Sequence, residues 1–191
     1  MTAMPTEASP GLPRGRSLTR DDLDAMPDDG HRYELIDGIL IVSPAPRRVH
    51  QRASFRLSVL IDATLPSDLE LLPAPFDVAL TDDTVMQPDL VVARVIDFTE
   101  RDLPVAPLLA VEVLSPSTRG IDLLLKKERL ERAGCAHYWV VDPDAPSITA
   151  WALEKGSYRE ITRASGDEVL EVDEPVAFTA VPADLVRTSG S

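Results

Sequence analysis

The feature that most constrains the fold is the apolar run APLLAVEVLSP, residues 106–116, which has a single carboxylate, Glu112, in its middle. Apolar runs of this length, rich in valine and leucine and bounded by proline and serine, are typical of a strand buried on both faces of a sheet. Burying an unpaired carboxylate costs several kcal/mol unless a cation, a metal or hydrogen-bond donors meet it. The run therefore predicts either a partner for Glu112 inside the fold or a strand whose Glu112 face lies at a solvated sheet margin.

The length and composition predict one ordinary domain. The chain has 191 residues, of which 44% are hydrophobic and 27% are charged, and a chain of this size buries roughly 70% of the surface that its unfolded form exposes. Apolar runs stay well below the roughly 20 residues of a membrane span, so we expect no membrane role. Residues 1–16 lack an apolar signal core and predict a disordered leader. We expect a cytoplasmic protein with a single domain over residues 17–191.

The charge balance and the cysteine count exclude other classes of function. The net charge is −13, from 19 Lys and Arg against 32 Asp and Glu, which counts against broad, non-specific attraction to nucleic acid. Cys135 is the single cysteine, so an internal disulfide and a cysteine-cluster zinc site are excluded.

Strand and helix patterns succeed one another along the chain and predict a mixed β-sheet flanked by helices, in the α/β or α+β class. Glu34 would lie on the first strand of a hairpin whose turn is Asp37-Gly38. The predicted elements are a short helix at 17–26 with Thr19 as N-cap, the hairpin at 33–43, a helix at 47–65, strands at 69–80, 89–95 and 108–114, a helix at 121–133, a strand at 137–143, a hairpin at 148–162 around Lys155-Gly156, one more short strand in the tail and a turn of helix near 183–186.

Asp89 is the acid that could meet Glu112. It follows Pro88 at the start of a predicted strand, and proline fixes the approach of the chain so that Asp89 can point off the sheet edge. Two acids on neighbouring strands can converge, and with a carbonyl and waters they form the oxygen-rich shell that Mg²⁺ takes. Such a site would activate a water against a phosphodiester. The other interpretation is that Asp89 caps the turn that Pro88 begins.

Asp122 and Lys126 lie four residues apart on the next predicted helix. They could form a surface ion pair in the favourable acid-first order. Alternatively, Lys126 reaches over the end of the Glu112 strand, where an ammonium could orient the attacking water or stabilise the phosphate.

The most basic surface of the chain belongs to the predicted helix over 47–65. Arg48, Arg52 and Arg56 recur at four-residue steps and Arg47 precedes them. These four arginines are the candidates for phosphate contacts, although a solvated helix face explains such a run equally well.

Taken in order, several motifs together resemble the Uma-two (Uma2) family of endonucleases, within the restriction-endonuclease-like superfamily named for its Pro-Asp, Asp/Glu-x-Lys signature, PD-(D/E)xK. The resemblance spans about residues 31 to 160. The motifs are YELIDG at 33–38, SPAP at 43–46 followed by His50, QPDL at 87–90, VEVLSPST at 111–118, Asp122 with Lys126, and YWVVDP at 138–143.

The resemblance implies a restriction-endonuclease-like fold and a role for each site residue. Asp89 and Glu112 match the metal-binding acids, with Mg²⁺ or Mn²⁺ as cofactor, and Glu34 matches an additional acid from an early segment. The signature lysine would stand at position 114, which is Leu114 here, so the resemblance assigns its role to Lys126. His50 stands where the family has a histidine, and a hydrogen bond at the start of the helix is the other explanation for it.

Two functions follow from these observations. The first is a magnesium-dependent endonuclease that hydrolyses DNA with low specificity, as a homodimer that places two cuts on a duplex. The second is a catalytically inactive nuclease-fold module that serves in protein binding or dimerisation. The net charge of −13 and Leu114 favour the second.

Overall fold

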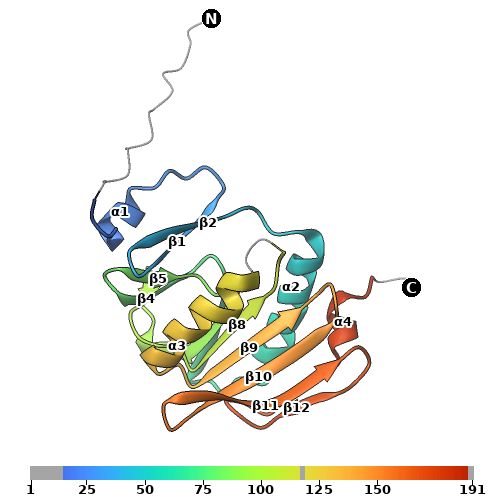
Figure 1. Ribbon diagram of the computed structural model, residues 1–191. Coiled ribbons are helices and arrows are strands. Elements are labelled where there is room, and N and C mark those ends of the chain that lie inside the picture. Colours follow the sequence, from blue (N-terminus) through green and yellow to red (C-terminus); the bar gives the residue numbers. More distant parts are fainter. Residues whose placement is uncertain (1–14, 117–118, 189–191) are drawn as a thin grey trace, which may run out of the picture.

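The structure is a computed structural model that describes residues 15–116 and 119–188, and its strands form three sheets (Figure 1). The largest sheet has six strands in the order β11-β10-β9-β8-β6-β3, and a second sheet has the order β2-β1-β5-β4-β7. The strands are β1 (Arg32–Ile36), β2 (Ile39–Ser43), β3 (Leu69–Pro73), β4 (Asp77–Thr81), β5 (Thr84–Met86), β6 (Leu90–Arg94), β7 (Asp102–Leu103), β8 (Leu109–Val113), β9 (His137–Asp142), β10 (Ser147–Glu154), β11 (Ser157–Ser165), β12 (Leu170–Val172) and β13 (Phe178–Ala180).

Helices flank these sheets, which confirms the predicted fold class. Strand β8 runs antiparallel to β6 and parallel to β9, so the large sheet is mixed, as predicted. The helical segments are α1 (Arg20–Asp24), α2 (Arg48–Asp62), the 3-10 turn η1 (Val95–Asp97), the π-helix η2 (Ile121–Lys126), α3 (Lys127–Ala133) and α4 (Pro182–Val186).

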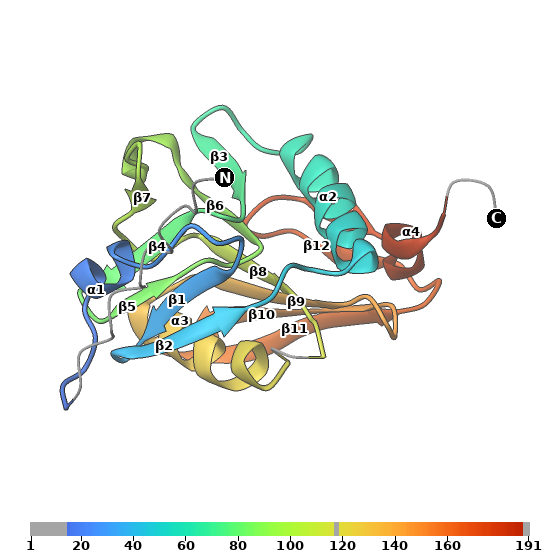
Figure 2. The same cartoon turned by 90° about the horizontal axis from the view of Figure 1, so that it is seen from above.

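The two faces of the large sheet carry different helices (Figure 2). Alternate residues of a strand point to opposite faces, and Leu109, Val111 and Val113 pack in one apolar cluster with the buried stripe of α2, which is Ala53, Leu57 and Ile61. Ala110 belongs to a second cluster with residues of η2 and α3. Glu112 has the parity of Ala110, so its side chain lies on the η2–α3 face.

Both predicted hairpin turns are present. Asp37 and Gly38 have φ of 52° and 73°, and Lys155 and Gly156 have φ of 52° and 83°. Two successive residues with positive φ suit the twist of a two-residue hairpin. Gly38 is required for a second reason, because a Cβ there would lie 2.4 Å from the Cβ of Ser17.

The chain start is partly described. Residues 1–14 of the predicted leader lie outside the described residues, whereas the Arg16 guanidinium donates to both carboxylate oxygens of Asp22, at 2.6 and 2.8 Å. The same carboxylate accepts the backbone N–H of Thr19 at 2.9 Å, which confirms the predicted helix start. A single domain over residues 17–191 stays a prediction.

Some predicted elements were wrong in detail. The predicted strand over 69–80 is two strands, β3 and β4, which belong to different sheets. Pro73 is the last residue of β3, and Pro75 at the break has no N–H to donate to a ladder. The predicted helix over 121–133 begins as a π-helix, and the short strands β5 and β7 were missed. Among residues 15–116 and 119–188, no helix is long and apolar enough to cross a membrane.

Candidate active site

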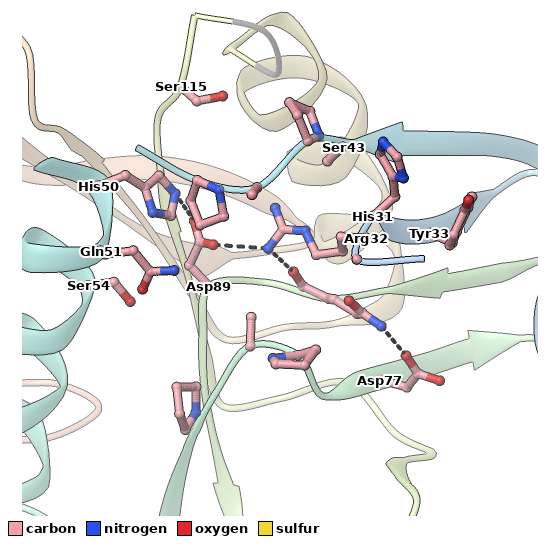
Figure 3. Close-up of a pocket in the computed structure, with 18 of the residues that line it drawn as sticks. His31, Arg32, Tyr33, Ser43, His50, Gln51, Ser54, Asp77, Asp89 and Ser115 are labelled. Atoms are coloured by element: carbon pink, nitrogen blue, oxygen red, sulfur yellow. Dashed lines mark hydrogen bonds and ion pairs between the residues drawn. The ribbon is translucent and has the colours of Figure 1, made fainter. Parts of the chain in front are cut away.

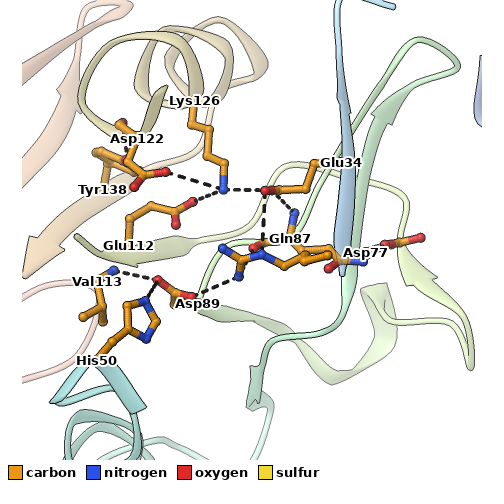
Figure 4. A network of polar contacts seen from close by, with 11 residues as sticks. Glu34, His50, Asp77, Gln87, Asp89, Glu112, Val113, Asp122, Lys126 and Tyr138 are labelled. Carbon is orange, nitrogen blue, oxygen red and sulfur yellow. Dashed lines mark hydrogen bonds and ion pairs between the residues drawn. The ribbon is translucent and has the colours of Figure 1, made fainter. Parts of the chain in front are cut away.

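Glu112 is 1% exposed in the middle of β8, with β6 on one side and β9 on the other. A solvated sheet margin is therefore wrong for this residue, and the alternative of a buried partner is confirmed. The Nζ of Lys126 lies 3.1 Å from Glu112 Oε1 (Figure 4). Burial raises the pKa of Glu112 well above its ordinary value; Lys126 opposes this rise, and the neighbouring carboxylates of Asp122, Asp89 and Glu34 add to it.

Lys126 is also 1% exposed, so the interpretation as a surface ion pair with Asp122 is wrong. Its Nζ lies 2.8 Å from Glu34 Oε1 and 3.7 Å from Asp122 Oδ1. Burial by itself would lower the pKa of Lys126, but the carboxylates of Glu112, Glu34 and Asp122 raise it above the ordinary value. Lys126 is therefore a charged ammonium held among three acids.

The π-helix η2 directs charged side chains inward. Its buried residues are Asp122 and Lys126, while Leu124 is 72% exposed. Short π-helical turns are rare and recur at functional sites. The hydroxyl of Tyr138 on β9 donates to the carbonyl of Asp122 at 2.6 Å, which ties η2 to the sheet.

Glu34 reaches the same cluster from β1 in the other sheet. It is 1% exposed, and its Oε1 accepts the backbone N–H of Gln87 at 2.7 Å. Its Oε2 lies 3.8 Å from Nε of Arg32. The site therefore lies where the two sheets meet.

Asp89 precedes β6 and lies directly beside Glu112. The pairing of Leu90 with Val111 places Asp89 opposite Glu112 one step further along the ladder, and opposite residues share one face of an antiparallel pair. Asp89 Oδ2 accepts the backbone N–H of Val113 at 2.8 Å. The prediction that the two acids come from neighbouring strands of one sheet is confirmed.

Two nitrogen-bearing side chains from distant segments, His50 and Arg32, hold the Asp89 carboxylate. Nε2 of His50 lies 3.1 Å from Oδ2, and the Arg32 guanidinium donates to Oδ1 at 3.1 Å. Burial would raise the pKa of Asp89, but the hydrogen bond and charge of His50, the charge of Arg32 and the Val113 N–H together lower it below its ordinary value. Asp89 is therefore a fixed carboxylate anion.

Among the described residues, the cluster brings four acids together with the charged side chains of Arg32 and Lys126. Asp89 is 4% exposed and Glu34, Glu112 and Asp122 are 1% exposed. Arg32 pairs with Glu34 and Asp89, and Lys126 lies among the three acids other than Asp89. Carboxylates that share a site resist joint ionisation. A proton on Glu112 or a cation would therefore relieve the cluster.

The four arginines named from the sequence lie away from this cluster. Arg52 donates to the carbonyl of Val186 at 3.1 Å, and Arg56 donates to the carbonyls of Asp184 and Arg187 at 2.5 and 2.7 Å. Arg47 pairs with Asp144 at 2.5 Å, and Arg48 is exposed. The contacts of Arg52 and Arg56 attach the C-terminal segment to α2. A role of the four arginines in phosphate binding stays a prediction.

Arg32 and Gln87 were missed from the sequence. A signal for Arg32 exists, since it stands two residues before Glu34 on one strand, and such residues share a face. The backbone contact of Gln87 with Glu34 has no sequence signal.

A groove of about 1020 Å³ leads to the cluster (Figure 3). Arg32, His50 and Asp89 line it, together with residues of α2 and of the segments 43–47 and 73–75. Among the described residues, Glu112 and Lys126 do not line this groove, so Asp89 is the site acid that faces it and Glu112 lies behind.

Comparison with known proteins identifies the family. The family model Uma2, described as "Putative restriction endonuclease", matches residues 20–183. The chain belongs to the Uma2 family. The matched segment includes every residue of the carboxylate cluster, so the resemblance stated from the motifs is confirmed.

A solved structure shows the same fold as this Uma2 chain. It is titled a "putative nuclease belonging to DUF820" from Anabaena variabilis, is 17% identical and has a TM-score of 0.69. The match covers 88% of this chain and 97% of the other. A search of curated proteins found no match.

The donor set of the Uma2 site suits a divalent cation in type. Asp89 and Glu112 offer carboxylate oxygens, which Mg²⁺ and Mn²⁺ prefer. Within the described residues, Glu112 Oε1 is buried and makes no aligned hydrogen bond. Within the same residues, no group of three or more His, Cys, Asp and Glu side chains is arranged to hold a metal. The Nζ of Lys126 lies between Glu34 and Glu112.

Proposed function

We propose that this Uma2 chain is a metal-dependent endonuclease that hydrolyses phosphodiester bonds of DNA. The supporting observation is the surplus of buried carboxylates around Lys126 at the inner end of a groove. If the cluster served only the stability of the core, apolar side chains in place of the acids and Lys126 would stabilise the protein more. Perturbed buried acids beside a groove are typical of catalytic sites.

Asp89 and Glu112 would hold Mg²⁺ or Mn²⁺, since they lie side by side on the sheet and Glu112 Oε1 has no aligned hydrogen bond in the described part of the chain. The bound ion would offset negative charge on the phosphate and make water more acidic. Asp89 Oδ1 accepts Arg32 and Oδ2 accepts two donors. A carboxylate has about four lone-pair sites, so Oδ1 keeps one for a ligand.

Lys126 would take the role of the signature lysine. Leu114 stands at the usual position on the strand, and the ammonium of Lys126 reaches Glu112 at 3.1 Å from the following helix. In a buried site such an ammonium orients water and stabilises the charge that develops on the phosphate. Glu34 holds the ammonium from the other side at 2.8 Å.

Arg32 and His50 would act on Asp89. Their contacts at 3.1 Å from two sides keep the carboxylate ionised and fix its direction. We assign them a positioning role, which preserves the ligand geometry before substrate enters.

Plasmid cleavage in Mg²⁺ or Mn²⁺ tests the proposal. We expect Glu112→Gln and Asp89→Asn to lose at least a hundredfold in rate. Glu171→Gln is the matched control, because Glu171 is an exposed strand residue away from the groove. Cleavage by Glu112→Gln at the rate of the unchanged chain would remove the assignment.

An inactive nuclease-fold module is the second candidate. The favouring observation is that Lys126 already lies between Glu34 and Glu112, where it offsets part of their charge. Titration calorimetry separates the two candidates. Heat of Mn²⁺ binding and a metal-dependent rise in melting temperature support the nuclease, and the absence of both supports the module.

Assembly and location complete the proposal. A homodimer would place two active sites on one DNA molecule, and analytical ultracentrifugation at micromolar concentration measures it. We also propose a cytoplasmic location, which cell fractionation tests.

A further inference from the structure

The buried carboxylate cluster lies behind the groove that Asp89 faces. Glu112 and Lys126 are 1% exposed behind Asp89, and the cavity of about 1020 Å³ lies near the upper end of small-ligand pockets, at roughly 300–1,000 Å³. Such a space holds a few nucleotides. A base-paired duplex carries its phosphates on a stiff cylinder, whereas a separated strand can lay one phosphodiester on the groove floor.

The α2 wall of the groove presents an aromatic ring. Phe55 is 69% exposed, although its helix buries Ala53 and Leu57 in the core, and Phe55 lines the groove. An exposed aromatic ring beside a strand channel is a stacking platform for a base. Val59, one turn later, is 53% exposed and does not belong to the described lining.

Polar side chains line both walls of the groove. Gln51 and Ser54 lie on α2, across the groove from His31 and Tyr33, with Arg32 and Asp89 between them (Figure 3). Amide and hydroxyl groups of this kind bond to the edges of unpaired bases, which are accessible only when the strand is single.

Three of the four arginines at α2 are engaged within the fold, and Arg48 is exposed. Arg47, Arg52 and Arg56 are held by Asp144 and by carbonyls of the C-terminal segment, and the chain carries a net charge of −13. Duplex affinity comes mainly from phosphate contacts by free Lys and Arg. Affinity in this groove would have to come from the bases.

We propose that the groove binds an unpaired DNA strand, with one base stacked on Phe55 and its phosphodiester directed at Asp89. This inference rests on the proposed nuclease function and specifies its substrate: single-stranded segments, flaps or frayed ends of DNA.

Fluorescence anisotropy in EDTA tests binding without cleavage. The probes are a labelled single-stranded oligonucleotide, the same sequence as a duplex, and a single strand with abasic positions, which keeps the phosphates and lacks the bases. We expect the single strand to bind at least tenfold more tightly than the duplex or the abasic strand. Phe55→Ala should lose roughly tenfold for the single strand and nothing for the abasic strand.

Val59→Ala is the matched control and should bind as the unchanged chain does. Both side chains are largely exposed, so both variants should keep the melting temperature. Equal binding of duplex and single strand, or unchanged binding by Phe55→Ala, would overturn the inference.

The experiment also separates the two proposals. Metal-dependent plasmid cleavage with no effect of Phe55→Ala on strand binding would overturn this inference and leave the nuclease. Base-dependent strand binding without cleavage in Mg²⁺ or Mn²⁺ would sustain the subsite and remove the catalytic proposal.

Discussion

The two faces of the five-residue strand β8 differ in the side chains that they bury. On one face, Leu109, Val111 and Val113 pack against α2 in an apolar cluster. On the other face, Glu112 meets Lys126 and is surrounded by three further acids. The first face gains free energy from burial, and the second holds charges against their desolvation cost. The comparison teaches that the same strand contributes stability on one side and holds the proposed active site on the other.

The largest expected effect comes from removing the buried cation. Lys126→Met should lower the free energy of unfolding by about 3–5 kcal/mol at neutral pH, because it leaves carboxylates uncompensated in a dry site. Urea unfolding measures the loss. Lys127→Met is the control, since Lys127 lies over the Trp151 ring, away from the cluster. If Mg²⁺ binds the acids, it should restore stability to the variant; a loss below about 1 kcal/mol would show that the charged face does not depend on the ammonium.

A truncation on the apolar face should cost about 2–5 kcal/mol with no change in chemistry. Leu109→Ala leaves a cavity beneath α2 and removes buried apolar surface. Chemical unfolding gives the cost, and cleavage per folded molecule gives the chemistry. If folded Leu109→Ala cleaved DNA more slowly than the unchanged chain, the claim that the apolar face contributes only stability would be wrong.

Glu112→Gln should stabilise the protein, in contrast to both truncations. Burial raises the pKa of Glu112 above its ordinary value of 4.5, so the folded protein retains a proton that the unfolded chain loses as the pH rises. Stability is therefore lost from the unchanged chain between the unfolded pKa and the raised folded pKa. In EDTA, the free energy of unfolding of Glu112→Gln should equal that of the unchanged chain near pH 4. It should exceed that of the unchanged chain by about 1–2 kcal/mol at pH 8. A gain that is independent of pH would contradict this account.

The smallest effect concerns the arginines of α2. Arg56→Gln removes the hydrogen bonds to the carbonyls of Asp184 and Arg187 and should cost about 1 kcal/mol. Arg48→Gln should leave the stability unchanged, because Arg48 is exposed. Thermal unfolding and DNA affinity of the two variants are measured together. A loss of stability indicates that the arginine attaches the C-terminal segment to α2, and a loss of DNA affinity indicates that it contacts phosphates.

The sequence predicted much of the fold because local signals were strong. Asp37-Gly38 and Lys155-Gly156 formed the predicted hairpin turns, and the apolar run around Glu112 formed the predicted buried strand. The predicted strand over 69–80 was wrong, since the apolar pattern continues across Pro75, which has no N–H to donate to a ladder.

The candidate site was predicted only in part. Asp89 and Glu112 were found because a carboxylate in an apolar strand demands a partner, and Lys126 was assigned from the family resemblance. Arg32 was missed, although it clamps Asp89 at 3.1 Å. Its role depends on how β1 of the second sheet approaches the first, and no local pattern encodes that approach.

The sequence by itself determined that Glu112 interrupts an apolar strand segment, because the apolar pattern of a strand is a local property. It left open whether Glu112 meets a partner inside the fold or lies at a solvated sheet margin. Only the tertiary structure decided which groups meet it. Lys126 turns inward from η2, Glu34 comes from another sheet and Arg56 fastens the C-terminal segment. These contacts join residues far apart in the chain, and such distances are set by the packing of sheets and helices.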